Sequence, residues 1–181
     1  MTDLWKIYRP VWQFLLVFFG TYGVMSGLYF YALDFWAENG QMVDPITNLV
    51  GQQVEYLLTF LGFSAQIAPW EQTGNLVISV VDTPVARLVE GCNAVSVMIL
   101  FMAFVVAIPQ RITHTLSFVI LGVFLIHMIN IGRIALISLG IYWRPRWSSV
   151  LHDLVFPGMI YGTVLLLWIF WIWRFKFKTD D

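Results

Sequence analysis

The sequence is poor in cysteine and in charge. Its single cysteine, Cys92, excludes an internal disulfide and a cysteine-rich metal site, so we expect no metal and no other cofactor. Charged residues make up only 12% of the 181 residues, whereas a soluble domain has about 25%. Apolar residues instead make up 59%. This composition argues against a soluble enzyme and predicts a polytopic membrane protein, for which we expect no nucleic-acid partner.

Four apolar runs are candidates to cross a membrane, which takes roughly 20 mostly apolar residues. They are residues 11–31, 92–108, 116–141 and 154–173, and the second is long enough only if it starts near Cys92. We therefore expect an all-α integral membrane protein, with a single domain over residues 1–181 built as a four-helix transmembrane bundle.

Small and aromatic residues indicate how these runs pack and where they sit. Glycines four residues apart offer faces for close helix packing in the first and fourth runs, at Gly23 and Gly27 and at Gly158 and Gly162. Tryptophans in the fourth run are expected to form an aromatic belt at the inner membrane surface, at Trp168, Trp171 and Trp173.

The distribution of Lys and Arg predicts the orientation, because cytoplasmic loops carry an excess of these residues. They lie before the first run, between the second and third runs and after the fourth, as Lys6, Arg9, Arg111, Arg174, Lys176 and Lys178. The insertion of residues 32–91 instead carries Asp34, Glu38, Asp44, Glu55, Glu71, Asp82 and Glu90 against Arg87 alone. We expect a protein of the cytoplasmic (inner) membrane with both termini in the cytoplasm and this insertion in the periplasm. Arg144 and Arg146 then lie outside, either as contacts to substrate or lipid headgroups or as a tolerated pair.

The outer insertion is expected to have structure of its own. Residues 49–63 repeat apolar side chains at a period close to 3.6, which predicts an amphipathic helix at the membrane interface, with a fifth span as the alternative. Residues 66–70 and 75–81 flank a turn at residues 71–74 and predict a β-hairpin. Pro84 is expected to end the second strand.

Three reactive side chains fall at a similar depth near the outer surface. At about 1.5 Å per helical residue, Cys92 lies roughly 24 Å and Arg133 roughly 26 Å above the inner ends of their runs. His152 precedes the fourth run, roughly 32 Å from that run's inner end. The hydrocarbon core is about 30 Å thick, so a thiol, a guanidinium and an imidazole converge at its outer edge.

Together these groups suit thiol acyl transfer, with Cys92 as the nucleophile. A nearby cation or helix start favours the reactive thiolate, and His152 can take the thiol proton and later protonate a leaving amine. Arg133 can stabilise the thiolate or hold the oxyanion of a tetrahedral intermediate, and both roles stay open. Each residue also has a structural interpretation. A lone membrane cysteine is usually inert, an intramembrane arginine can snorkel to the interface, and His127 is expected to be a hydrogen-bonded core residue.

The motifs around these residues resemble those of the exosortase/archaeosortase family of integral-membrane sorting enzymes. Three segments carry the resemblance: Glu90-Gly91-Cys92-Asn93-Ala94 is similar to the cysteine motif, Asn130-Ile131-Gly132-Arg133-Ile134 to the N-x-x-R motif, and His152-Asp153 with Pro157-Gly158 to the histidine motif. The resemblance covers roughly residues 49–170 and is greatest to the exosortase F-type branch of Bacteroidetes. Members often have Ser-Gly where this chain has Asn93-Ala94.

The resemblance implies a cysteine transpeptidase with Cys92, Arg133 and His152 as catalytic residues. Its partners would be membrane lipid, an amine acceptor that the sequence does not identify, and secreted proteins whose C-terminal signal combines a short motif, a membrane helix and a basic tail. Four more residues are expected to contact substrate: Asn93, Asn130, Arg144 and Arg146. Two other functions stay open. One is hydrolysis of the same acyl-enzyme, and the other is a non-enzymatic subunit, either a solute-binding component of a transporter or an assembly scaffold.

Overall fold

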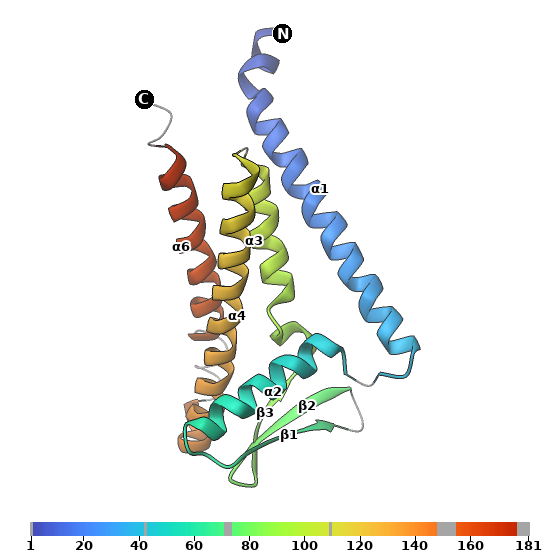
Figure 1. Cartoon of the computed structure of the whole chain (residues 1–181), viewed down its shortest axis with the longest axis vertical. Helices are drawn as coiled ribbons and strands as arrows, with labels where there is room; N and C mark the ends of the chain where they lie inside the picture. The colour runs from blue at the N-terminus through green and yellow to red at the C-terminus, as the bar shows by residue number, and fades with distance from the viewer. Residues whose placement is uncertain (1, 42, 71–73, 109, 148–154, 177–181) are drawn as a thin grey trace.

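The protein is built from a layer of long helices and a smaller layer of one helix and three strands. The computed structural model describes residues 2–41, 43–70, 74–108, 110–147 and 155–176. In chain order the elements are α1 (Thr2–Glu38), α2 (Pro45–Phe60), β1 (Ala65–Trp70), β2 (Asn75–Val80), β3 (Thr83–Leu88), the 3-10 turn η1 (Glu90–Cys92), α3 (Val95–Ala107), α4 (Ile112–Trp143), the 3-10 turn η2 (Pro145–Trp147) and α6 (Phe156–Lys176). The long helices alternate in direction, so both chain ends lie opposite α2 and the strands (Figure 1).

Three helices are long and apolar enough to cross a membrane: α1, α4 and α6. The fourth expected span is the exception, because α3 has only 13 residues and a length of about 20 Å against a hydrocarbon core of about 30 Å. It is instead the most enclosed helix, with Phe101, Ala103 and Val105 fully buried. A helix that is apolar on all sides is stable when neighbours cover it. The four-helix transmembrane bundle therefore stays a prediction.

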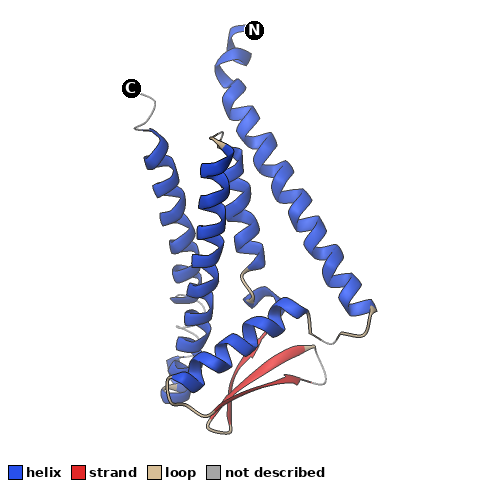
Figure 2. Ribbon diagram, viewed as in Figure 1, coloured by secondary structure: helices blue, strands red, loops and turns tan. Residues whose placement is uncertain are grey.

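The smaller layer, formed by α2 and the three strands (Figure 2) and called the outer layer below, takes part in a hydrophobic core of its own. One face of α2 is buried through Val50, Val54 and Leu58, which pack in one cluster with the inward side chains of β2 and with the later part of α4. Helix α4 reaches this layer because its 32 residues extend for about 48 Å, well beyond the hydrocarbon thickness. The predicted amphipathic helix is thus present as α2. Its apolar face, which the 3.6-residue period indicated, packs against β2 and α4.

The predicted β-hairpin is confirmed, but the expectation that Pro84 ends its second strand is wrong. Strands β1 and β2 pair antiparallel from Ala65↔Val80 to Trp70↔Asn75. The chain then turns at Val81 and Asp82, both with positive φ, and returns as β3 beside β2. Pro84 lies inside this third strand, opposite Ser79. It is tolerated because β3 is an edge strand, where the missing N–H need not join the ladder.

Aromatic rings connect α3, α4 and α6 at the end that holds the chain termini. Trp168 stacks on Phe104 at 4.3 Å between ring centroids, and Trp171 stacks on Phe118 at 4.5 Å. Trp171 is 2% exposed, whereas Trp173 is 59% exposed. The expected aromatic belt is therefore wrong for Trp168 and Trp171, whose rings pack between helices.

Glycine allows close helix contact at a position that the spacing pattern did not indicate. A methyl group at Gly122 of α4 would overlap the ring of Phe101 on α3. The four glycines of the expected small faces have open space where a Cβ would stand, with no atom within 4 Å at Gly23, Gly27, Gly158 and Gly162. Those faces are not used for packing within the part of the chain that the structure describes.

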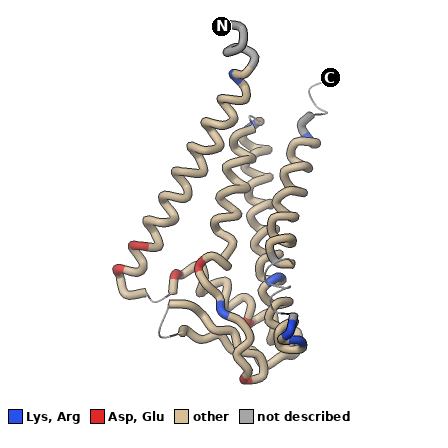
Figure 3. The backbone as a smooth tube through the Cα atoms, turned by 180° about the vertical axis from the view of Figure 1, so that it is seen from behind, with Lys and Arg blue, Asp and Glu red and all other residues tan. Residues whose placement is uncertain are grey.

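Charge is distributed unevenly along the molecule. The described acidic side chains lie toward the end with the strands, whereas Lys and Arg are found at both ends (Figure 3). Three described arginines belong to the end with the chain termini: Arg9 early in α1, Arg111 just before α4 and Arg174 near the end of α6. This polarity matches the charge distribution from which the orientation is predicted.

Candidate functional site

Cys92 lies on a turn between the two layers. It is the last residue of η1, its N–H donates to the carbonyl of Val89 at 2.8 Å, and its side chain is partly exposed. Helix α3 begins only at Val95, because Ala94 adopts a left-handed conformation with φ 63° and ψ 10°. The expected helix start at residue 92 is therefore wrong by three residues. The left-handed conformation favours glycine, so alanine is strained at this position.

Asn93 fixes this turn to two other helices. Its side chain is 2% exposed, and its Nδ2 donates to the hydroxyl of Tyr29 on α1 at 2.7 Å and to Oγ1 of Thr47 on α2 at 3.1 Å. Its Oδ1 accepts from the backbone N–H of Val95 at 3.0 Å, which satisfies a donor at the start of α3. The amide of Asn93 thus holds the residue beside Cys92 in one position.

Helix α4 holds the backbone of Cys92 from the other side. Asn130 is fully buried, and its Nδ2 donates to the carbonyl oxygen of Cys92 at 2.8 Å. Its Oδ1 is buried without a hydrogen-bond partner among the described residues. Because the amide nitrogen must face the carbonyl of Cys92, the orientation of the Asn130 side chain is set by this bond.

The structure brings Arg133 to the thiol. Arg133 lies one helical turn after Asn130, on the same face of α4. Its guanidinium is close enough to the Cys92 side chain to interact with it electrostatically. Tyr161 on α6 also interacts electrostatically with this guanidinium. Two of the three predicted reactive side chains, 41 positions apart in the chain, therefore lie close to one another.

His127 has a partner of its own on the same face of α4. Its Nε2 lies 2.8 Å from Oε1 of Gln53 on α2. This contact connects the middle of α4 to the outer layer, as expected for a hydrogen-bonded structural histidine. His127 is about 9 Å along the helix from Arg133, at 1.5 Å per residue over six residues.

The remaining predicted residues are placed differently. His152 lies outside the described residues, so its proposed role stays a prediction. Arg144 and Arg146 are exposed at the far end of α4, and Arg144 lies about 16 Å along the helix axis from Arg133. The structure does not bring this pair to Cys92. Asn93 and Asn130 make internal hydrogen bonds, and their contact with substrate also stays a prediction.

Several residues of this site carry no signal in the sequence. Tyr29 and Thr47 reach the turn, and Tyr161 comes near Arg133, only in the folded chain, since the three residues belong to three different helices. One signal could have been read: Asp44 before Pro45 is a helix N-cap, and its Oδ1 accepts from the N–H groups of Ile46 and Thr47. That cap defines the start of α2 and so the position of Thr47 beside Asn93.

The arrangement can present a thiolate to a carbonyl carbon. A thiolate is the nucleophilic form of cysteine, and a cation at its side stabilises it where the surroundings are partly apolar. Partial exposure leaves Cys92 accessible, while Asn93 and Asn130 limit its movement. Among the described residues, no group of three or more His, Cys, Asp or Glu side chains is placed to hold a metal ion.

Comparison with known proteins adds no relative to this description. No family model, no curated protein and no solved structure matches the chain. The function is therefore argued from the residues around Cys92 and from the helices that surround them.

Proposed function

We propose that this chain is a membrane-embedded cysteine peptidase or transpeptidase of the exosortase type, acting on C-terminal sorting signals of secreted proteins. The observation that carries the proposal is the electrostatic interaction between the Cys92 side chain and the Arg133 guanidinium. An arginine within a membrane helix is unfavourable by roughly 2.5 kcal/mol or more. Its position near the single cysteine therefore supports a catalytic role for both side chains.

In the proposed reaction the Cys92 thiolate attacks the carbonyl carbon of the scissile peptide bond. The C–S bond forms as the carbonyl becomes an oxyanion, and the C–N bond then breaks to leave a thioester on Cys92. His152 takes the thiol proton and delivers it to the leaving amine. An amine acceptor or water next attacks the thioester carbonyl carbon while His152 removes a proton from it. The C–S bond then breaks, and His152 returns this proton to the departing Cys92 thiolate. Protons and electron pairs balance without an added oxidant or reductant.

Arg133 has two roles in this scheme that differ in timing. Before attack it pairs with the thiolate, and after attack it can instead donate to the oxyanion of the tetrahedral intermediate. Asn130 and Asn93 act as positioning residues, since each bonds to the backbone beside the thiol. Tyr161 of α6 is near enough to the same guanidinium to interact with it electrostatically.

The proposal includes a location. Helices α1, α4 and α6 cross the cytoplasmic membrane, and α3 together with the turn before it completes a four-helix bundle. Both termini are cytoplasmic, and α2 with the sheet lies on the periplasmic side. Cys92 is then near the outer edge of the hydrocarbon, where a substrate helix can arrive laterally with its cleavage motif just outside the membrane.

The decisive experiment follows the C-terminal size of a substrate in cells that produce single variants. We expect Cys92→Ala, Arg133→Ala and His152→Ala each to abolish processing, and the losses not to add because the three groups act on one intermediate. Arg87→Ala, an exposed arginine on β3, is the matched control and should process normally. His127→Ala should keep most activity, because its described partner is Gln53.

The outcomes separate the competing functions. Normal processing by well-expressed Cys92→Ala would show that the chain is not a thiol enzyme and would favour a transporter subunit or scaffold. Loss with His127→Ala but not with His152→Ala would keep the enzyme and move its base to α4. The product mass distinguishes transfer, which adds the acceptor amine, from hydrolysis, which adds water.

A further inference from the structure

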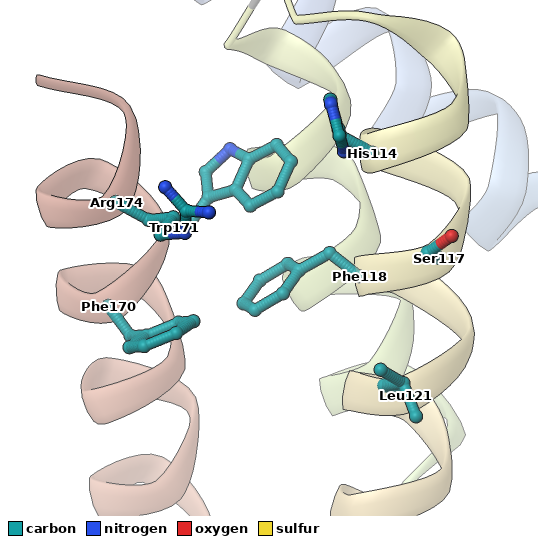
Figure 4. A pocket seen from close by; sticks show the side chains of 7 residues that line it. All are labelled: His114, Ser117, Phe118, Leu121, Phe170, Trp171 and Arg174. Carbon is teal, nitrogen blue, oxygen red and sulfur yellow. The ribbon is translucent and has the colours of Figure 1, made fainter. Parts of the chain in front are cut away.

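A groove lies between the first turns of α4 and the last turns of α6, at the end of the molecule far from Cys92 (Figure 4). Its volume is about 190 Å³. Sites for drug-sized ligands have about 300–1,000 Å³, so this groove suits a slender ligand that continues outside it. The catalytic proposal uses no residue of this groove.

The groove is polar at one end and apolar at the other. His114, Ser117 and Arg174 supply the polar groups, and the guanidinium of Arg174 extends across the groove toward α4 (Figure 4). The rings of Phe118 and Phe170 lie farther from the chain termini. A charged head above an apolar channel is the layout that a phospholipid requires.

The exposure of the lining residues indicates an opening toward the bilayer. Leu121 is 66% exposed and Phe170 is 49% exposed, whereas Trp171 is 2% exposed and forms the floor between the helices. The apolar walls belong to α4 and α6, both long enough to span the membrane. An acyl chain can therefore run along these side chains while the rest of the lipid stays in the bilayer.

The local charge selects the headgroup. Arg174 is the charged side chain among the residues that line the groove, and the described acidic side chains lie toward the opposite end of the molecule (Figure 3). The basic tail of a substrate would be repelled here, and a free inorganic anion would leave the apolar walls uncovered. Basic pockets between transmembrane helices suit anionic lipid headgroups.

We propose that this groove binds one anionic phospholipid, with its phosphate at Arg174 and His114 and an acyl chain along Phe118, Leu121 and Phe170. The proposal requires the chain to be in a membrane but does not depend on its being an enzyme. The bound lipid would lie against α4 and α6 at the end where aromatic stacking joins the two helices.

The test measures lipid retention on the purified full-length protein by native mass spectrometry. Long-chain phosphatidylglycerol should be retained, whereas long-chain phosphatidylcholine and free glycerol phosphate at matching concentrations should not. Each cation near an anionic headgroup contributes about 1 kcal/mol, so Arg174→Gln should weaken phosphatidylglycerol binding about fivefold. Arg9→Gln, an exposed arginine at the same end but on α1, is the matched control and should bind within about twofold of the parent protein.

A second variant tests the apolar part of the groove. Leu121→Trp adds volume at an exposed position, so the fold should be retained while the acyl channel is filled. It should reduce phosphatidylglycerol retention without changing the net charge. Equal retention of phosphatidylcholine, binding of free glycerol phosphate as strong as that of the lipid, or unchanged retention in Leu121→Trp would each overturn the proposal.

Discussion

At the scale of single residues, the site depends on one thiol placed beside one guanidinium. Cys92 belongs to a turn whose backbone is held by Asn93 and Asn130, and Arg133 approaches from the helix that carries Asn130. Because α4 presents Asn130 and Arg133 on one face, a single helix both positions the thiol and supplies its cation. The pairing is therefore as rigid as the packing of α4.

The labelling rate of Cys92 distinguishes the two roles of Arg133. If the guanidinium stabilises the thiolate in the resting protein, Arg133→Gln should slow alkylation of Cys92 at neutral pH several-fold, because the thiolate loses its cation. The measurement is the rate of labelling by an iodoacetamide reagent in membranes. Arg87→Gln removes an exposed arginine of the outer layer and should leave the rate unchanged. An unchanged rate in a folded Arg133→Gln protein would assign Arg133 to the oxyanion or to the fold.

At the scale of elements, the start of α3 decides where the thiol lies. A helix that began at Cys92 would turn the side chain with the helical repeat, whereas the left-handed conformation of Ala94 separates η1 from α3. Outside glycine, that conformation is unfavourable by roughly 1–2 kcal/mol. The hydrogen bonds of Asn93 to Tyr29, Thr47 and Val95 stabilise the turn against this strain.

Substitutions at Ala94 test this junction. A β-branched residue is strongly disfavoured at positive φ, so Ala94→Val should lower the free energy of unfolding by about 2 kcal/mol and reduce processing. Ala94→Gly should be close to neutral, because relief of the strain offsets the lost methyl group. Ala107→Val, at the opposite end of α3 and equally buried at 5%, controls for added volume. Equal destabilisation at Ala94 and Ala107 in denaturant unfolding would argue against backbone strain.

At the scale of the whole molecule, the fold separates an outer layer from the helical layer and places Cys92 at their boundary. Helix α4 belongs to both layers, since its later part packs against α2 and the sheet while its first half packs with α3 and α6. The site and the lipid groove lie toward opposite ends of this helix. In the proposed orientation they face opposite sides of the membrane.

Reporter fusions test that orientation. A reporter that is active only in the periplasm should be active when inserted at Gly74, in the turn of the hairpin, and inactive when fused after Asp181. The reason is the excess of Lys and Arg at the chain ends and of acidic residues in the outer insertion. Activity after Asp181, or its absence at a well-expressed Gly74 fusion, would contradict the proposed topology.

The features that local sequence determines were predictable, and those that long-range contacts determine were not. The long helices, the hairpin and the buried face of α2 follow from apolar length and periodicity, which a short stretch of chain specifies alone. The similar depth of Cys92 and Arg133 could be estimated by counting residues along the helices, whereas their interaction depends on how α4 packs beside the turn that holds Cys92.

Tertiary structure alone decided the length of α3, the third strand and the hydrogen bonds that hold the thiol. Pro84 joins a strand because β3 is at the sheet edge, and Asn93 finds Tyr29 across 64 residues of chain. Tyr161 approaches Arg133 because α6 packs beside α4. Such contacts form where elements pack together, and the spacing of residues along the chain does not specify which faces of the elements will pack.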